Sequence, residues 1–197
     1  MIESVCVFCG SSDSVASVYL QAADAMGRAI ARRGVTVVYG GGGTGLMGAV
    51  ADGALAEGGR VVGILPRLFD SPVLRHGRLS ELRVVDSMHE RKAMMIEVSQ
   101  GFVALPGGFG TLEELFEVLT WAQIGLHHRP VGMLNANGYF ADLLRWMERA
   151  AADGFIYPEH QGLYVWASEP EALLEGLESY RRPEGLERWM TRTEADR

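Results

Sequence analysis

The feature that most constrains the fold is a repeated alternation of short apolar runs with helical stretches. Strand-like runs lie at 5–9, 35–39, 60–65, 82–85, 101–105, 131–134 and 163–166. Helical stretches lie at 15–33, 46–57, 88–99, 139–152 and 170–180, and another follows the turn at 106–110 and ends near 124. Continuous apolar runs are typical of strands buried on both faces. Repeated strand–helix units imply a parallel sheet with right-handed crossovers, so we predict a doubly wound α/β fold.

The chain shows no internal repeat, linker or low-complexity tract. We therefore expect one domain over residues 1–180, followed by a charged C-terminal tail over 181–197. The least regular segment is 66–81, where Pro66, Pro72 and Gly77 interrupt any period. We expect it to be a loop that lies over the edge of the sheet.

Charge and cysteine content limit the possible partners and compartment. The formal net charge is −7, which argues against nucleic acid, because such partners require a basic face. No apolar run reaches the roughly 20 residues of a membrane span, and no secretory signal opens the chain, so we expect no membrane partner and a cytoplasmic protein. Cys6 and Cys9 stand three apart in a strand, where they point to opposite faces, and are expected to be structural thiols.

Three turns follow strands and lead toward helix starts: residues 10–13, 40–45 and 106–111. In parallel sheets the carboxyl ends of the strands share one edge, where ligands bind. Free backbone N–H groups and the positive end of a helix suit an anion there, and three such turns together favour a phosphate-bearing ligand. The run 40–45 is not a P-loop, because it lacks the Gly-Lys-Ser/Thr sequence of that motif. It also lacks the acidic residue that ends the following strand in dinucleotide-binding proteins, so we do not expect NAD.

The turn after the fifth run carries carboxylates into a helix start. Gly107 and Gly108 allow a close approach of the backbone to a ligand, and Glu114 follows Thr111 at the spacing of a capping box. Two interpretations stay open. Glu114 either satisfies the backbone N–H of Thr111, or it acts chemically.

Arg91 and Lys92 stand side by side at the start of another helix. They either clamp a phosphate or form a solvated charged face, and Arg91 is also a suitable partner for Glu114. The five histidines show no metal-ligand spacing, and no nucleophile elbow is present.

Together these motifs resemble the Lonely Guy family of cytokinin riboside 5′-monophosphate phosphoribohydrolases, long mislabelled as lysine decarboxylases. The resemblance covers about residues 5–177. It rests on four segments, namely Cys9–Gly10–Ser11–Ser12, Tyr39–Gly40–Gly41–Gly42 with Gly45–Leu46–Met47–Gly48, Met88–His89–x–Arg91–Lys92, and Pro106–Gly107–Gly108–x–Gly110–Thr111–x–x–Glu114.

The resemblance implies a Rossmann-like three-layer α/β/α fold, a homodimer, and hydrolysis of N6-modified adenosine monophosphates or AMP without metal or organic cofactor. It implies Arg91 and Glu114 as the catalytic pair. The predicted substrate-binding residues are Lys92, Gly108, Phe109, Gly110, Thr111, Leu112, Glu113 and Thr120, with Ser11, Gly42 and Gly45 from the other turns. Many relatives carry an acidic residue that helps to hold the substrate roughly where Val73 and Leu74 stand here.

In the expected reaction, Glu114 faces the ribose C1′, stabilises an oxocarbenium-like cation and guides a water molecule. Helix N-termini at Gly110 and Gly45 would hold the 5′-phosphate with Lys92. Two alternatives remain: a broader nucleosidase acting on AMP or pyrimidine monophosphates, and a non-catalytic nucleotide or cofactor carrier. A pyridoxal-dependent decarboxylase is disfavoured, because Lys92 is the only lysine and stands in the setting of a phosphate clamp.

Overall fold

The computed structural model describes residues 2–186, and they form a seven-stranded parallel sheet. The strand order is β4-β3-β2-β1-β5-β6-β7, which confirms the predicted doubly wound α/β fold. The strands are β1 (Ser4–Phe8), β2 (Thr36–Tyr39), β3 (Val61–Pro66), β4 (Glu81–Val85), β5 (Gly101–Ala104), β6 (Val131–Leu134) and β7 (Tyr164–Ala167).

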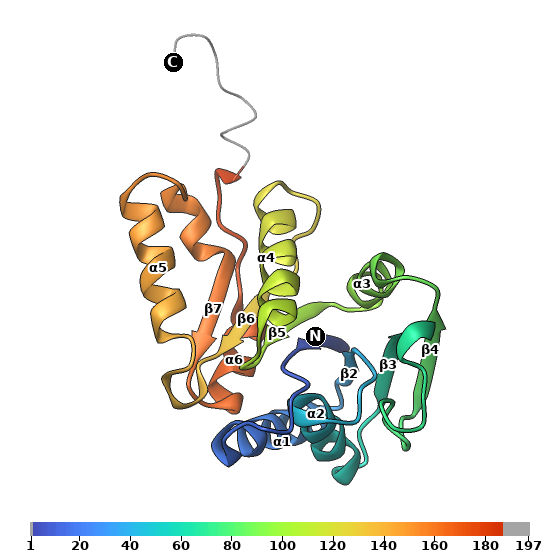
Figure 1. Cartoon of the computed structure of the whole chain (residues 1–197). Helices are drawn as coiled ribbons and strands as arrows, with labels where there is room; N and C mark the ends of the chain where they lie inside the picture. Colours follow the sequence, from blue (N-terminus) through green and yellow to red (C-terminus); the bar gives the residue numbers. More distant parts are fainter. Residues whose placement is uncertain (1, 187–197) are drawn as a thin grey trace.

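Helices cover both faces of the sheet, as the three-layer prediction requires (Figure 1). On one face lie α1 (Ser17–Arg32), α2 (Gly45–Ala56) and α6 (Pro170–Ser179); on the other lie α3 (Met88–Glu97), α4 (Phe109–Gln123) and α5 (Ala141–Ala152). The predicted helices and strands agree with these bounds to within about two residues. Short helical turns that the periodicity did not predict are η1 (Arg67–Phe69), η2 (Ala136–Gly138) and η3 (Pro158–Leu163).

Alternate residues of β1 face the two separate cores of the molecule. Val5, Val7 and Cys9 pack with α1 and α2, whereas Cys6 and Phe8 pack with α3 and α4. Both cysteines are free and buried, and they lie in different cores, which confirms that they point to opposite faces. Burial on both faces explains why the strands read as unbroken apolar runs.

The strand order reverses at β1, which pairs with β2 on one side and β5 on the other. A crevice opens where neighbouring crossovers leave in opposite directions, and ligands of doubly wound folds bind there. The turns that follow β1 and β5 are in contact, because Gly10 donates its N–H to the Pro106 carbonyl at 3.0 Å.

Segment 66–81 lies against the glycine turn that follows β2. Gly43 donates to the Leu74 carbonyl, His76 donates to the Gly41 carbonyl, and Gly42 forms an isolated bridge with Arg75. The segment therefore covers one end of the crevice.

The C-terminal tail was predicted from residue 181, and the structure describes its first part. Leu186 is buried in the core that contains α4, so the chain stays packed to that point. The rest of the predicted tail, 187–197, lies outside the described residues. Within residues 2–186, no helix combines the length and apolar character that crossing a bilayer requires.

Candidate functional site

The N-terminus of α2 is closed by the turn that follows β1. Gly45 donates its N–H to Asp13 Oδ1 at 2.7 Å, and Leu46 and Met47 donate to the Gly10 carbonyl at 3.0 and 3.3 Å. The Thr44 hydroxyl also donates to a carbonyl of this turn, that of Ser11. The Gly45 N–H, which the sequence suggested as a phosphate ligand, is therefore already bonded to a carboxylate.

The N-terminus of α4 differs from that of α2. The helix begins at Phe109 with Gly108 as its N-cap, and no side chain caps it. Leu112 makes the first bond of the helix, to Gly108. No hydrogen bond within the described part of the chain uses the N–H groups of Phe109, Gly110 or Thr111. Three donors at a positive helix end form a suitable site for a phosphate.

The capping-box interpretation of Glu114 is wrong. Thr111 lies inside α4 instead of at its N-cap, because the two glycines start the helix two residues earlier. The Glu114 carboxylate instead accepts a hydrogen bond from Arg91 Nη1 at 2.9 Å. Arg91 and Glu114 are only 6% exposed each, so the solvated-face interpretation of Arg91 is also wrong.

Burial and pairing together set the charge state of Glu114. Burial raises the pKa of the Glu114 carboxyl, and Arg91 partly counteracts this by favouring the ionised form. A backbone contact also holds the Arg91 guanidinium in place, because its Nε donates to the Ile64 carbonyl at 3.3 Å. The pair is thus a buried carboxylate with a single oriented cation, an arrangement frequent in active sites.

Gly40 explains why the glycine turn begins directly after β2. A Cβ on Gly40 would lie 3.1 Å from Arg91 Cζ and closer still to Nη2. Glycine at this position therefore leaves room for the Arg91 guanidinium next to the end of β2. The sequence showed the glycine run, but not which of its members Arg91 touches.

A cavity of about 340 Å³ opens beside Arg91. Ser11, Gly40, Gly42 and Thr44 line it on the side of the glycine turns. Its apolar walls were not predicted, and they come from α2, from β3 with the segment that follows it, and from α3: Met47, Leu65, Pro66, Phe69, Leu74 and Met88. Such an apolar pocket with few polar groups is typical of sites for small organic ligands.

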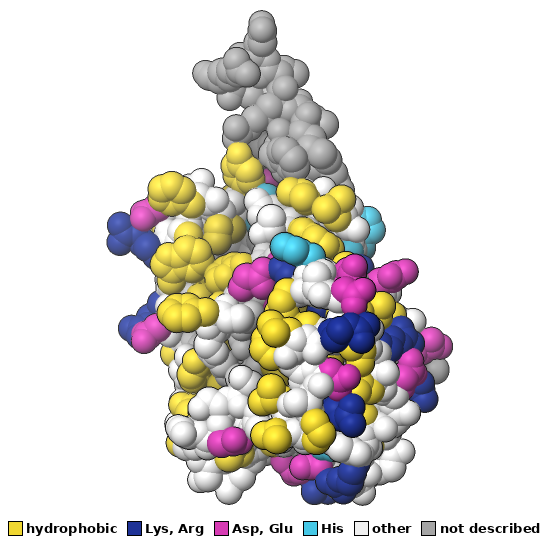
Figure 2. Space-filling model, turned by 45° about the vertical axis from the view of Figure 1, so that its right-hand side comes forward, with side chains coloured by type: hydrophobic (Ala, Val, Ile, Leu, Met, Phe, Trp, Pro, Cys, Tyr) yellow, Lys and Arg dark blue, Asp and Glu magenta, His cyan; other side chains and the backbone are white. Residues whose placement is uncertain are grey.

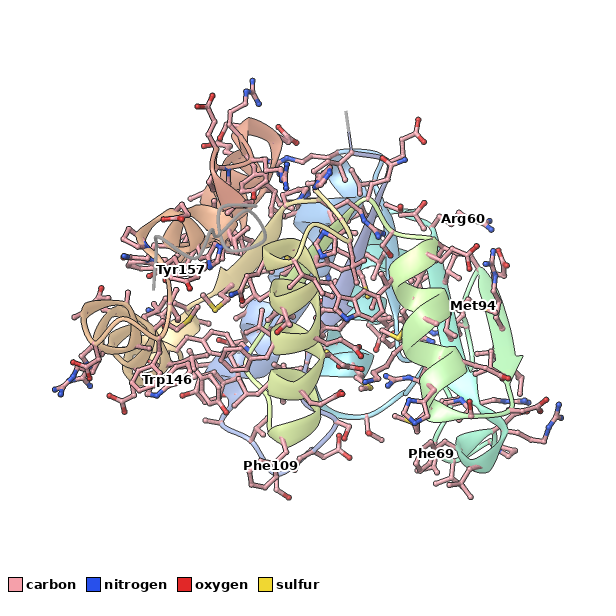
Figure 3. The ribbon with its side chains drawn as sticks, turned by 90° about the horizontal axis from the view of Figure 1, so that it is seen from above. Arg60, Phe69, Met94, Phe109, Trp146 and Tyr157 are labelled. Atoms are coloured by element: carbon pink, nitrogen blue, oxygen red, sulfur yellow. The ribbon has the colours of Figure 1, made fainter. Side chains whose placement is uncertain are left out.

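A second cavity, of about 300 Å³, lies on the other side of Ser11. Gly107 and Gly108 line it, together with Tyr19 and Tyr139. The Tyr139 hydroxyl donates to the Gly107 carbonyl at 2.6 Å, which holds the turn before α4 in place. The free N-terminus of α4 therefore borders this cavity, and Phe109 and Phe69 lie at the same end of the molecule (Figure 3).

The departure from the family pattern lies at the rim of the first cavity. Leu74 lines the cavity, whereas the side chain of Val73 is 83% exposed. Where the family resemblance predicts an acidic residue, the chain therefore adds apolar surface to the cavity and no charge.

Among the predicted substrate-binding residues, Ser11, Gly42 and Gly108 line these cavities. The others do not, namely Lys92, Phe109, Gly110, Thr111, Leu112, Glu113, Thr120 and Gly45. Lys92 Nζ is ion-paired with Glu113 and, at 3.1 Å, with Glu117, so α3 is tied to α4. Thr120 is exposed further along α4, where it lines a shallow cleft with His160. Leu112 packs partly buried against the core. Lys92 thus pairs with Glu113 and Glu117 beside the Arg91–Glu114 pair, whereas Thr120 lines a different cavity.

Within residues 2–186, no three His, Cys, Asp or Glu side chains are grouped so that they could hold a metal ion.

Comparison with known proteins gives consistent matches over most of the chain. A family profile described as "Possible lysine decarboxylase" matches residues 47–177. The probable cytokinin riboside 5′-monophosphate phosphoribohydrolase LOGL9 of Oryza sativa subsp. japonica is 48% identical over 176 residues, which is 89% of this chain and 78% of that protein. The cytokinin riboside 5′-monophosphate phosphoribohydrolase of Rhodococcoides fascians is 47% identical and is covered to 90%, as is this chain.

Solved structures support the fold alone. The molybdenum cofactor carrier protein of Chlamydomonas reinhardtii superposes with a TM-score of 0.71 at 21% identity, over 91% of this chain and 98% of that one. The molybdenum cofactor binding protein of Rippkaea orientalis gives a TM-score of 0.68, also at 21% identity, over 91% and 97%. The identity and coverage of the sequence matches show that this chain belongs to the Lonely Guy family of cytokinin riboside 5′-monophosphate phosphoribohydrolases.

Proposed function

We propose that this protein hydrolyses the N-glycosidic bond of N6-modified adenosine 5′-monophosphates or AMP, giving the free base and ribose 5-phosphate. The observation that carries the proposal is the buried Arg91–Glu114 pair, which lies between a free helix N-terminus and an apolar cavity. The named activity of relatives at 43–48% identity supports the same reaction.

The three parts of a nucleotide fit the three parts of this site. The 5′-phosphate binds the free N–H groups of Phe109, Gly110 and Thr111 at the start of α4. The base enters the cavity beside Arg91, where Leu65 and Phe69 supply apolar walls that suit a purine and an apolar N6 substituent. The ribose then spans the distance between them, over Glu114.

Glu114 carries the chemistry. Cleavage of the bond between C1′ and the base nitrogen builds positive charge on the ribose, as in glycoside hydrolysis. An ionised Glu114 stabilises that charge and orients a water molecule toward C1′. Arg91 favours the ionised form of the buried carboxylate, against the effect of burial, and fixes its direction. Binding of the remote phosphate helps to place C1′ against the carboxylate.

We also propose a homodimer. Large apolar side chains are exposed on or next to α4 and α5, with Phe109 94%, Trp146 54% and Phe155 86% exposed. Figure 2 shows hydrophobic side chains gathered on the surface of the molecule, and exposed apolar patches mark interaction surfaces. Thr120 and Glu113 are exposed on α4 as well, so a partner on this face would contact two predicted substrate-binding residues that do not line the cavities.

The test is base release from AMP and from its N6-isopentenyl analogue by the native protein and by Glu114→Gln. Glu97→Gln is the control, because Glu97 is an exposed carboxylate at the other end of α3. We expect Glu114→Gln to lower kcat about 10²–10⁴-fold, the range typical of a residue that acts in the transition state, while Glu97→Gln keeps the native rate.

Each other outcome points to a different function. Binding of AMP without release of base from either nucleotide would favour a carrier. Comparable rates on pyrimidine monophosphates would favour the broader nucleosidase. Equal rates on the unphosphorylated riboside would contradict the role assigned to the α4 N-terminus.

A further inference from the structure

The segment that follows β3 forms the outer wall of the cavity of about 340 Å³, but its apolar side chains do not anchor it in the core. Phe69 and Leu74 line the cavity, yet they are 40% and 44% exposed. Of residues 67–84, only His76 is buried. A buried polar side chain among exposed apolar ones indicates a specific contact, because buried polar groups need hydrogen-bond partners.

Both ring nitrogens of His76 have a partner. Nδ1 accepts a hydrogen bond from the backbone N–H of Arg78 at 3.2 Å. Nε2 therefore carries the ring hydrogen and donates it to Asp52 Oδ1 of α2 at 3.1 Å. The side chain of His76 is 6% exposed, and Arg78 forms an ion pair with the same carboxylate. The His76 ring thus joins the outer wall of the cavity to α2.

The backbone of His76 ties the same point to the glycine turn. Its N–H donates to the Gly41 carbonyl at 2.9 Å, and Gly43 donates to the Leu74 carbonyl at 2.8 Å. A Cβ on Gly43 would lie 3.3 Å from His76 Cα, so the turn and the segment are in direct contact. Gly42, between these two bonds, lines the cavity. The side-chain bond to α2 therefore holds two walls of the cavity together.

We propose that His76 is a positioning residue that keeps the outer wall of the cavity in the form that binds the base. The proposal rests on the hydrolase function proposed above, in which the base enters this cavity and the phosphate binds at the start of α4. His76 does not line the cavity, so it acts through Leu74 without touching the ligand. Without the bond to Asp52, the wall would occupy this position for a smaller fraction of the time, and the apparent affinity for the nucleotide would fall by that fraction.

The test variant is His76→Ala, which removes both side-chain hydrogen bonds. His76→Gln is the conservative variant, because a glutamine amide can still donate to Asp52. Asp52→Ala breaks the same bond from the side of α2, where alanine favours the helix. The matched control is His128→Ala, since His128 is exposed. We would measure kcat and KM with AMP, and inhibition by ribose 5-phosphate, which has no base.

We expect His76→Ala and Asp52→Ala to raise KM for AMP about tenfold and to keep kcat within about threefold, the order expected for one hydrogen bond to a charged group. The inhibition constant of ribose 5-phosphate should stay within about twofold of native, because this ligand does not reach the wall. His76→Gln should recover most of the native KM, and His128→Ala should match the native protein. A purely structural role would reduce the amount of folded protein, which lowers the apparent kcat and leaves both KM and the inhibition constant unchanged.

An unchanged KM for AMP in a folded His76→Ala protein would overturn the proposal. An equal rise in KM and in the inhibition constant would overturn it as well, because the change would then not be confined to the base. If His76→Ala does not fold, Asp52→Ala decides between these outcomes. If the native protein releases no base from any nucleotide, the hydrolase function fails, and calorimetric titration of native and variant proteins with AMP and ribose 5-phosphate still decides the role of His76.

Discussion

Gly40→Ala tests the geometry of the Arg91–Glu114 pair, proposed above as catalytic, with a single methyl group. The backbone at Gly40 does not have a positive φ, so alanine is compatible with its conformation. The new Cβ would meet Arg91 Cζ at 3.1 Å and Nη2 at a shorter distance, against an ordinary contact of about 3.5–4.0 Å. The guanidinium must therefore move by about 1 Å or more, and its bond to Glu114 must lengthen or turn.

The effect on the rate should be much larger than the effect on folding. A displacement of about 1 Å in a positioned catalytic group costs about 10²-fold in rate. Overpacking of a buried position costs about 1–3 kcal/mol in the free energy of unfolding, which corresponds to roughly 2–10 °C in Tm for a domain of this size. The variant should thus remain folded at 25 °C and release base about 100 times more slowly.

The assay is base release under saturating AMP, run beside thermal unfolding. Gly77→Ala is the control, because a Cβ on Gly77 has no atom within 4 Å. Gly77→Ala should match the native protein in both measurements. A Gly40→Ala protein with a kcat within twofold of native would refute the reasoning, since the position of Arg91 would then not limit the reaction.

Two further predictions concern charge and assembly. Because burial raises the pKa of Glu114, kcat should fall on acidification at a pH above the ordinary glutamate value of about 4.3. Arg91→Met should move this acidic limb of the kcat–pH profile to still higher pH, because the variant loses the cation that favours the ionised carboxylate. An acidic limb at the same pH in both proteins would contradict the role of Arg91. The native state binds the extra proton, so Glu114 also lowers the free energy of unfolding as pH rises through that window, and Glu114→Gln should remove this part of the pH dependence. Trp146→Arg, at a half-exposed site in edge contact with Phe116, should leave the protein folded and convert a dimer to monomers in small-angle scattering. The apparent Tm should fall, because association stabilises the native state. A native protein that is already monomeric would refute the dimer.

Much of the fold follows from local patterns in the chain. The apolar runs and helical stretches gave the strands and helices to within about two residues, because strands buried on both faces have no polar positions and glycines end the helices that precede them. The short helical turns near Phe69 and His160 were missed, since three to six residues carry no detectable period.

The sequence by itself determined the elements, the parallel sheet and the residue types available for chemistry, because these depend on neighbours within a few positions. It left Glu114 undecided between a cap and a catalytic group. Only the tertiary structure excluded the cap, by placing Arg91 of α3 against the Glu114 carboxylate of α4. It also decided which helix end is free: Asp13 is 32 residues from Gly45 in sequence, and no local pattern reveals that its carboxylate closes α2. Contacts between distant segments arise when the strand order brings two turns together, and that order depends on how the whole sheet packs.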